Sequence, residues 1–366
     1  MTQTHYLRPI ALADSPQSEE GEVQRLAGGL VYASRFALIT RAEGKIIART
    51  RYSVPELRAA MPSLPDAVRE QWDNLARVHA PLQCGARTIR LDQPQVMGIL
   101  NLTPDSFSDG GQFMDDPEVA GAHASAMLEA GAAIIDVGGE STRPGAAAVW
   151  EGDELKRVIP AIERLAAAGA AISADTRRPA VMEAALAAGA HLINDVSALR
   201  HDPRSLEFAA RSGAPVVLMH APGEGEDLHG GSGYADVVLD VFDWLHARRD
   251  AALAAGIARD RILLDPGIGF GKSVADNLLL LNALPLFHAL GQPLLVGSSR
   301  KRMIGALSGE APAHQRLGGS VALAVKAMDA GVQVLRVHDV AETVQAVRVW
   351  RGLKDAALTD FSQLGN

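Results

Sequence analysis

Polar and ionisable side chains follow eight short apolar runs of this sequence, at the point where each run ends. Each run is rich in Ile, Leu and Val and is short enough to be a strand buried on both faces. Burying one such polar group without a partner costs on the order of a few kcal/mol, so their repeated occurrence indicates one shared binding site. In chain order they are Asn101; Asp136; Asp175; Asn194 and Asp195; His220; Asp265; Ser298, Ser299, Arg300 and Lys301; and Arg336, His338 and Asp339.

These side chains divide by charge, and the division indicates the kind of substrate. Asp175, Asn194 and Asp265 suit a neutral heterocycle with N–H and carbonyl edges, because a carboxylate accepts two bonds from a guanidine-like N–H/NH2 pair. A second group is cationic and suits a phosphate or diphosphate. Its members are Arg300, Lys301, Arg336 and His338.

A metal ion is also compatible with a phosphorylated substrate. Asn101 and the loop carboxylates Asp105 and Asp109 are suited to help hold Mg²⁺, which takes few protein ligands alongside substrate phosphates. The residues together predict a polar heterocycle that carries a phosphorylated group.

Two of these residues also have plainer interpretations, and one loop is not the motif that it resembles. An Asp at the end of a strand, such as Asp136, is as often the cap of the next helix as a functional residue. His220 is more simply explained as a hydrogen-bonded histidine on the rim. The segment GIGFGKS (267–273) is not a Walker A loop, because that motif needs a Gly five residues before Gly271, where Pro266 stands. Its glycines instead allow a loop to approach a ligand closely.

The elements that must position these residues alternate regularly from about residue 95 onward. Ala-rich helical segments end in Ala-Gly and a short apolar run follows, as in EAGAAIIDVGG (129–139) and DAGVQVLRVHD (329–339). Eight such units predict an α/β fold, a TIM (β/α)8 barrel over residues 86–366, with an open doubly wound sheet as the alternative. The C-terminal ends of barrel strands meet at one face, where the polar residues are expected to converge.

Residues 1–85 do not share this alternation and predict a small N-terminal α+β extension. Segment 36–50 indicates two short strands around Glu43-Gly44, and segment 54–80 indicates helix broken near Pro62 and Pro65. The extension contains no recognisable motif, so we expect it to have a structural or interface role.

The composition of the 366 residues excludes several classes of protein. A net charge of −8 disfavours binding to nucleic acid or to an acidic membrane. Cys84 is the single cysteine, which rules out an intrachain disulfide and a Cys-based metal cluster. No apolar run reaches about 18 residues, and the first residues lack the pattern of a signal peptide. We therefore expect a soluble, cytoplasmic protein.

Seven motifs together closely resemble the dihydropteroate synthases, in that family's order and from about residue 88 to the C-terminus. They are MGILNLTPDSFSDGG (97–111), DVGGESTRPGA (136–146), SADT (173–176), INDVS (193–197), LLDPGIGFGK (263–272), GSSRKRMIG (297–305) and LRVHDV (335–340). The resemblance implies a TIM-barrel transferase of folate biosynthesis. It would join 6-hydroxymethyl-7,8-dihydropterin diphosphate to 4-aminobenzoate, releasing pyrophosphate, with Mg²⁺ as cofactor. It also implies a homodimer and a sulfonamide target.

The same resemblance assigns roles to single residues. The pterin would be held by Asp175, Asn194, Asp265 and Lys301, with Arg336 stacked on its face. Asn101 would bind Mg²⁺, and Arg336 and His338 would hold the diphosphate. Thr142 matches a substrate-binding position. The leaving group would depart before attack, with Asp109 and Arg143 closing over a pterin-methyl cation, and Pro144, Phe270 and Ser299 would line the aminobenzoate pocket.

Two positions depart from the family's common pattern, and two alternatives stay open. Ile268 stands where Phe is frequent, and the loop at 220–237 differs from the commoner version with Met and Pro. One alternative is a pterin-dependent methyltransferase, which does not share the paired DSFSDGG and STRPG loops or the RVHD end. The other is a catalytically idle pterin-binding paralogue, against which the intact loops weigh.

Overall fold

The computed structural model describes residues 3–16, 22–103, 117–143, 145–146, 149–231 and 233–359. Eight parallel strands form its central sheet, and nearly all their residues are buried, as the apolar runs predict. These strands are β7 (Gln95–Asn101), β8 (Ile134–Gly138), β9 (Ile172–Asp175), β10 (Leu192–Asp195), β11 (Val216–Met219), β12 (Ile262–Asp265), β13 (Leu295–Val296) and β14 (Val334–Val337).

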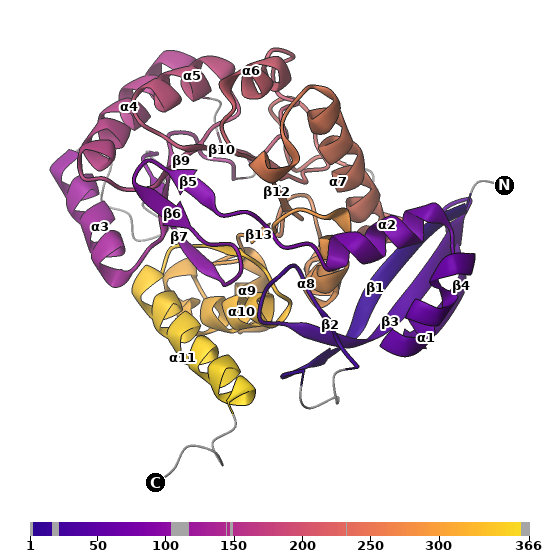
Figure 1. Cartoon of the computed structure of the whole chain (residues 1–366). Helices are drawn as coiled ribbons and strands as arrows, with labels where there is room; N and C mark the ends of the chain where they lie inside the picture. Colours follow the sequence, from indigo (N-terminus) through magenta and orange to yellow (C-terminus); the bar gives the residue numbers. More distant parts are fainter. Residues whose placement is uncertain are drawn as a thin grey trace, which may run out of the picture.

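The sheet closes on itself and confirms the predicted TIM barrel. Its strand order is β12-β11-β10-β9-β8-β7-β14-β13, and a bridge between Leu264 and Leu294 joins its two ends. Figure 1 shows the strands surrounded by a ring of helices. The α-helices of this part are α3 (Pro117–Ala130), α4 (Glu151–Ala167), α5 (Pro179–Ala187), α6 (Ser205–Ser212), α7 (Val237–Ala254), α8 (Val274–Phe287), α9 (Arg302–Leu307), α10 (Leu317–Asp329) and α11 (Val340–Leu358). Short 3-10 turns lie at η4 (Arg259–Arg261), η5 (His288–Leu290) and η6 (Ala313–Gln315).

Local signals in the sequence set where several helices begin. Pro179 is at the first position of α5, where its missing N–H costs nothing. The Asp236 side chain accepts hydrogen bonds from the first backbone N–H groups of α7. Ser273 and Asp276 form a reciprocal capping box at the start of α8, directly after the GIGFGK segment. That cap fixes one end of a loop that faces the candidate site.

A small hairpin covers the end of the barrel that lies opposite the polar strand ends. It consists of β5 (Leu82–Cys84) and β6 (Arg87–Ile89), and it lies in front of the barrel strands in Figure 1. Its buried side chains belong to one apolar cluster with the first residues of the barrel strands, such as Met97 and Ile134. Gly85 lies in the turn of this hairpin, with φ of +60°. The division into residues 1–85 and 86–366 stays a prediction, and the hairpin spans that boundary.

The N-terminal residues form an antiparallel sheet with two helices, as the α+β prediction expects. Its elements are β1 (Gln3–Ala13), β2 (Gln24–Arg25), β3 (Tyr32–Ala42), β4 (Lys45–Ser53), α1 (Val54–Ala60), η2 (Met61–Ser63) and α2 (Asp66–Leu75). The turn at Glu43-Gly44 and the helix break near Pro62 and Pro65 are confirmed. Strand β1 was not predicted, because its apolar residues do not alternate regularly; it is formed by pairing with β3.

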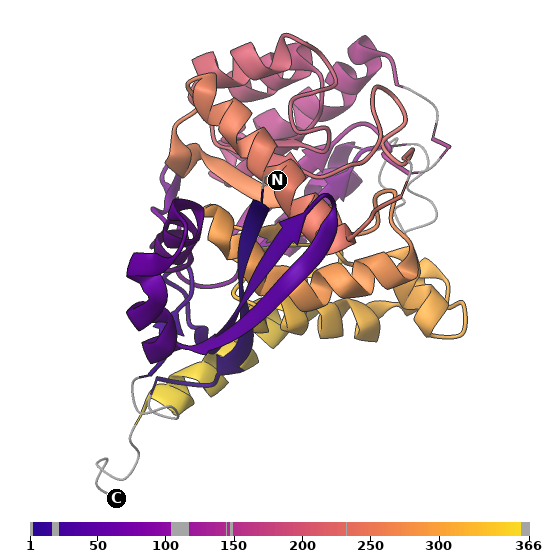
Figure 2. The ribbon, with the colours of Figure 1, turned by 90° about the vertical axis from the view of Figure 1, so that its right-hand side faces the viewer.

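The N-terminal sheet packs on α7 and α8 of the barrel, as Figure 2 shows from the side. The Tyr6 ring meets Phe242 edge-on at 5.5 Å, and its hydroxyl donates to the Asp243 carboxylate at 2.8 Å. Arg41 forms an ion pair with Asp240 at 2.7 Å. One hydrophobic core therefore runs from the extension into the barrel.

Among the described residues, no helix combines the length and apolarity that crossing a membrane requires.

Candidate active site

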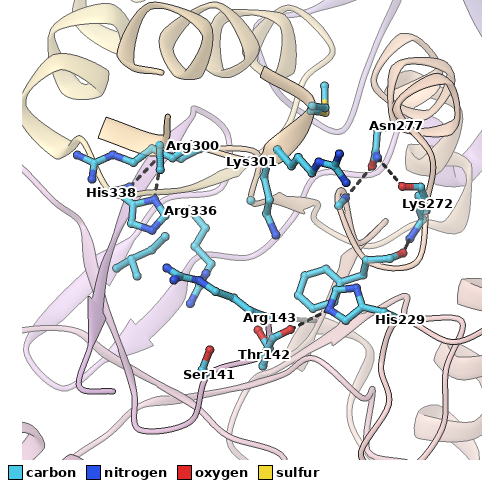
Figure 3. A pocket seen from close by; sticks show the side chains of 18 of the residues that line it. Ser141, Thr142, Arg143, His229, Lys272, Asn277, Arg300, Lys301, Arg336 and His338 are labelled. Atoms are coloured by element: carbon cyan, nitrogen blue, oxygen red, sulfur yellow. Dashed lines mark hydrogen bonds between the residues drawn. The ribbon is translucent and has the colours of Figure 1, made fainter. Parts of the chain in front are cut away.

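A cavity of about 800 Å³ opens at the C-terminal ends of the barrel strands. It gathers most of the residues that the sequence predicts for the site (Figure 3). Asn194 and Asp265 are buried at the same strand ends. Asp105, Asp109 and Pro144 lie outside the described residues. The predicted site residues that line the cavity are Asn101, Thr142, Arg143, Asp175, Phe270, Ser299, Arg300, Lys301, Arg336 and His338.

Arg336 joins two carboxylates at the base of this cavity. Its Nε donates to Asp136 at 2.6 Å and its terminal nitrogen to Asp175 at 2.6 Å. Burial raises the pKa of Asp175, against the opposing effect of Arg336. Burial by itself lowers the pKa of Arg336, but Asp136 and Asp175 raise it overall, so the guanidinium stays charged. Arg336, predicted as part of the cationic group, thus pairs directly with Asp175 of the acceptor group, because barrel closure brings β14 beside the strands that carry the acids.

Asp136 contacts Arg336 and Asn194 from below the cavity and does not cap the next helix. The residue before α4 is Trp150, which makes no side-chain cap. Asn194 donates to the same oxygen of Asp136 that Arg336 binds, at 3.1 Å. The other oxygen, Oδ1, is buried without a hydrogen-bond partner among the described residues.

Asp265 supplies a second buried carboxylate at the end of β12. Its Oδ1 accepts a hydrogen bond from the backbone N–H of Gly267 at 2.7 Å, which fixes the start of the GIGFGK loop. Burial raises the pKa of Asp265 to about 6, while this hydrogen bond and the nearby lysines act in the opposite direction. The group is therefore mostly ionised at neutral pH and can accept from a ligand.

The GIGFGK loop places an aromatic ring under a lysine. The ammonium of Lys301 lies 4.4 Å from the centre of the Phe270 ring, a cation–π contact. Gly269 has φ of +85°, and a Cβ there would come within 2.9 Å of the Lys301 side chain. Glycine at this position therefore lets the loop pass close to Lys301.

Lys272, the last residue of the same motif, holds the loop from inside. Its ammonium donates to the carbonyls of Gly267 and Phe270 at 2.8 and 3.0 Å and lies 2.9 Å from His220 Nδ1. Burial lowers the pKa of Lys272 to about 7. Burial also lowers the pKa of His220, to about 2, and the nearby charge of Lys272 acts in the same direction. His220 is thus a neutral, hydrogen-bonded histidine as expected, but it is buried and not on the rim.

The residues after β13 and β14 contact one another at the opposite wall. The Ser299 hydroxyl lies 3.2 Å from both the backbone nitrogen and Nδ1 of His338. Arg300 forms an ion pair with Asp339, its Nε 3.1 Å from the carboxylate. The charge of Arg300 is therefore compensated inside the protein, in contrast to the expected cationic group. Arg316 also lines the cavity and donates to the Arg300 carbonyl; it was missed because it lies far along the chain from any strand end.

Sequence reasoning also missed a buried ion network beneath the GGEST segment. Glu140 pairs with Arg177 and Arg178, each at 2.9 Å, and Arg178 reaches Glu154 at 2.6 Å. Burial raises the pKa of Glu140, but the two arginines lower it overall. The signal was present, because Glu140 lies within a motif and the Arg pair directly follows SADT, but only the fold pairs them.

The metal-binding potential of the described residues is modest. They contain no group of three or more His, Cys, Asp or Glu side chains arranged to hold a metal ion. Asn101 lines the cavity, and a Cβ on Gly138 would lie 3.5 Å from the Asn101 side-chain oxygen. One neutral oxygen ligand that lines the cavity fits a cation that obtains most of its ligands from a phosphorylated substrate.

Comparison with known proteins gives consistent matches. The family model of pterin-binding enzymes matches residues 97–338. A dihydropteroate synthase of Neisseria meningitidis serogroup B is 48% identical over 276 residues, covering 74% of this chain and 96% of the relative. The structure of the Xanthomonas albilineans dihydropteroate synthase with 4-aminobenzoic acid has 51% identity and a TM-score of 0.70, covering 76% of this chain and 99% of that one. The structure of the Yersinia pestis dihydropteroate synthase with a sulfonamide drug has 47% identity and a TM-score of 0.71. The match covers 75% of this chain and 99% of that one.

Proposed function

We propose, from the premise that the chain belongs to the pterin-binding enzymes and within them to the dihydropteroate synthases, that it catalyses this family's reaction in folate biosynthesis. It joins 6-hydroxymethyl-7,8-dihydropterin diphosphate to 4-aminobenzoate and gives 7,8-dihydropteroate and pyrophosphate. The observation that carries this proposal is the convergence of buried acceptors and cations from different strand ends on one cavity. Sulfonamides, as arylamines, are expected to compete for the aminobenzoate end of that cavity.

The base of the cavity is the proposed pterin site. Asp175, Asn194 and Asp265 present two carboxylates and an amide, which match the N–H, NH2 and carbonyl edges of a pterin. Lys301 offers a donor to the pterin carbonyl from above Phe270. Arg336 is the planar cation that would stack on the pterin face. In the structure it pairs with Asp136 and Asp175, so pterin binding has to replace part of that pairing.

The proposed reaction breaks the C–O bond to the diphosphate and forms a C–N bond to the arylamine, whose nitrogen then loses a proton. Catalysis requires stabilisation of the departing negative charge, an electrostatic task for which no nucleophilic side chain is needed. Arg336 and His338, which both line the cavity, would bind that charge. Thr142 would contact the substrate, Asp109 and Arg143 would cover the pterin-methyl cation, and Pro144, Phe270 and Ser299 would line the arylamine side.

Mg²⁺ is the proposed cofactor, held by Asn101 and by the substrate diphosphate. When bound, it would supply charge neutralisation of the leaving group.

Turnover should require all three components of this scheme. Purified protein with Mg²⁺ should release pyrophosphate steadily only when pterin diphosphate and 4-aminobenzoate are both supplied, and EDTA should reduce the rate at least about tenfold. A coupled pyrophosphate assay measures this. Binding of pterin without any dihydropteroate formation would instead identify a catalytically idle paralogue, and methyl transfer from methyltetrahydrofolate would identify the methyltransferase.

The proposed partners are these small molecules and a second copy of the chain, in the cytoplasm. Helix α11 offers a surface for that copy, since Val349 and Leu353 are 60% and 67% exposed on the same side of the helix. Exposed apolar side chains at helical spacing are typical of a homodimer interface.

Light scattering after size exclusion should therefore give twice the mass of one chain. Leu353→Arg should shift the protein to a single chain at micromolar concentration, because it places a charge in the apolar contact. The exposed Leu279 on α8 provides the control, and Leu279→Arg should leave the mass unchanged. A single-chain mass for the unmodified protein would contradict the homodimer.

A further inference from the structure

The loop that follows β11 is tied to its neighbours by hydrogen bonds and by apolar packing. Arg177 donates to the carbonyl of Gly225 at 2.7 Å. Arg200 donates to the carbonyls of Ala221 and Gly223 at 3.1 and 2.9 Å. Leu228 is buried in one small apolar cluster with Phe270 of the GIGFGK loop. The residue that follows, His229, is therefore presented to the cavity from a fixed backbone.

The Asp227 side chain fixes the backbone at His229 itself. Its Oδ1 accepts hydrogen bonds from the backbone N–H groups of His229 and Gly230, both at 2.9 Å. This is a local turn that Asp forms readily with residues two and three positions on. The direction of the His229 side chain is thus set by contacts within its own loop.

The His229 ring links two other loops through its two nitrogens. Nδ1 accepts a hydrogen bond from the backbone N–H of Gly271 at 3.3 Å. Nε2 lies 2.8 Å from the carbonyl oxygen of Thr142, as the dashed line in Figure 3 shows. A carbonyl only accepts, so Nε2 carries the proton and the neutral imidazole satisfies both contacts. One side chain thereby joins the STRPG loop after β8 to the GIGFGK loop after β12.

The same ring also extends the aromatic wall of the cavity. It stacks on Phe270 with the ring centres 5.1 Å apart and the planes 9° from parallel. Phe270 in turn lies under the ammonium of Lys301, 4.4 Å from the ring centre. The hydrogen bonds to Thr142 and Gly271 hold the His229 ring in the stacked orientation. The position of this ring and the distance between the two loops therefore depend on each other.

We propose that His229 is a positioning residue for the arylamine substrate. It holds the carbonyl of Thr142 and the loop of Phe270 at a fixed separation and so sets the width of the cavity between them. This inference rests on the proposed function, since it assigns the aminobenzoate to the space beside Phe270. Among the described residues, the side-chain contacts of His229 are with Thr142, Gly271 and Phe270 and not with Asp136, Asp175 or Asp265, so we assign it to the second substrate and not to the pterin.

Two substitutions separate the two roles of this side chain. His229→Phe keeps a ring that can stack on Phe270 but removes both hydrogen bonds. His229→Gln removes the ring but keeps one donor and one acceptor for Thr142 and Gly271. The matched control is His246→Phe, because His246 lies on α7 with 47% of its side chain exposed and does not line the cavity.

We expect His229→Phe to raise KM for 4-aminobenzoate about tenfold, the effect of losing hydrogen bonds that hold a site. KM for the pterin diphosphate and kcat should stay within about twofold of the unmodified enzyme, and His229→Gln should recover part of the loss. The control should match the unmodified enzyme. An unchanged KM for 4-aminobenzoate, or an equal rise for both substrates, would overturn the proposal.

A binding measurement keeps the proposal testable if the protein proves inactive. Calorimetry should show that His229→Phe weakens 7,8-dihydropteroate, which carries the arylamine, about tenfold more than it weakens 6-hydroxymethylpterin. Equal effects on the two ligands would contradict the role of His229. Absence of turnover with the difference in binding intact would instead contradict the proposed enzyme activity alone.

Discussion

Replacing Asp265 by Asn should weaken pterin binding by about 100-fold or more, because a site built to pair buried donors is then left with an unpaired one. The substitution preserves shape, and the remaining side-chain oxygen can still accept from the Gly267 N–H at 2.7 Å. What changes is the second atom, which becomes an NH2 group that faces the N–H donors of the ligand. Isothermal calorimetry with 6-hydroxymethylpterin measures the loss.

The charge of Asp265 adds a dependence on pH to the same experiment. Burial raises the pKa of this carboxyl to about 6. As the pH falls through that value, protonation removes an acceptor, so affinity in the unmodified protein should decrease. Asp265→Asn should lose this part of the pH dependence, while Asp175, whose pKa burial also raises, retains its own.

A matched control stands at the other end of the same strand. Asp260 lies in the turn before β12 and is exposed, so Asp260→Asn should leave pterin affinity unchanged. If Asp265→Asn binds pterin as tightly as the unmodified protein, the assigned role of this carboxylate is wrong.

Removal of residues 1–81 should lower the melting temperature by about 10 °C or more, while the protein that stays folded keeps its turnover number. Deletion uncovers Phe242 on α7, which contacts the Tyr6 ring, and each large apolar side chain contributes about 1.5–3 kcal/mol when buried. It also removes the ion pairs of Arg41 with Asp240 and Asp243. None of the described residues before 82 lines the cavity, so catalysis has no direct need of them.

The cut at residue 81 keeps the β5–β6 hairpin, which covers the barrel end. Calorimetric unfolding and the pyrophosphate assay should be run together, since the prediction separates stability from catalysis. Within the full chain, Tyr6→Ala should cost about 3 kcal/mol, because it deletes a fully buried ring, whereas Ile47→Ala, at a side chain 56% exposed on β4, should have little effect. An unchanged melting temperature, or a folded but inactive truncated protein, would contradict a purely structural role.

Solved relatives of this chain lack a counterpart to about a quarter of it. The solved relatives are covered almost completely, yet they match only about three quarters of this chain. In these relatives the barrel therefore forms without any counterpart to the remaining quarter of this chain. In this chain, however, Tyr6 and Phe36 are fully buried within a core that includes barrel helices, so the extension covers part of its own barrel surface.

The sequence by itself determined the barrel and the composition of its polar face. Runs of four or five apolar residues followed by Asp175, Asn194 or Asp265 define strand ends without knowledge of any long-range contact, because burial and periodicity are local properties. The turn at Glu43-Gly44 could be predicted for the same reason. Strand β1 could not, since its stability comes from pairing with β3 and from packing on α7.

Only the tertiary structure decided which of these groups neutralise or position one another. Arg336 contacts Asp136 across 200 positions of sequence, and Glu140 contacts Arg177 across 37, so no local pattern relates them. His229 gains its role from Thr142 and Gly271, which lie on loops after two other strands. The physical reason is that charge pairing and hydrogen bonding act over a few ångströms, and barrel closure alone brings these strand ends within that range.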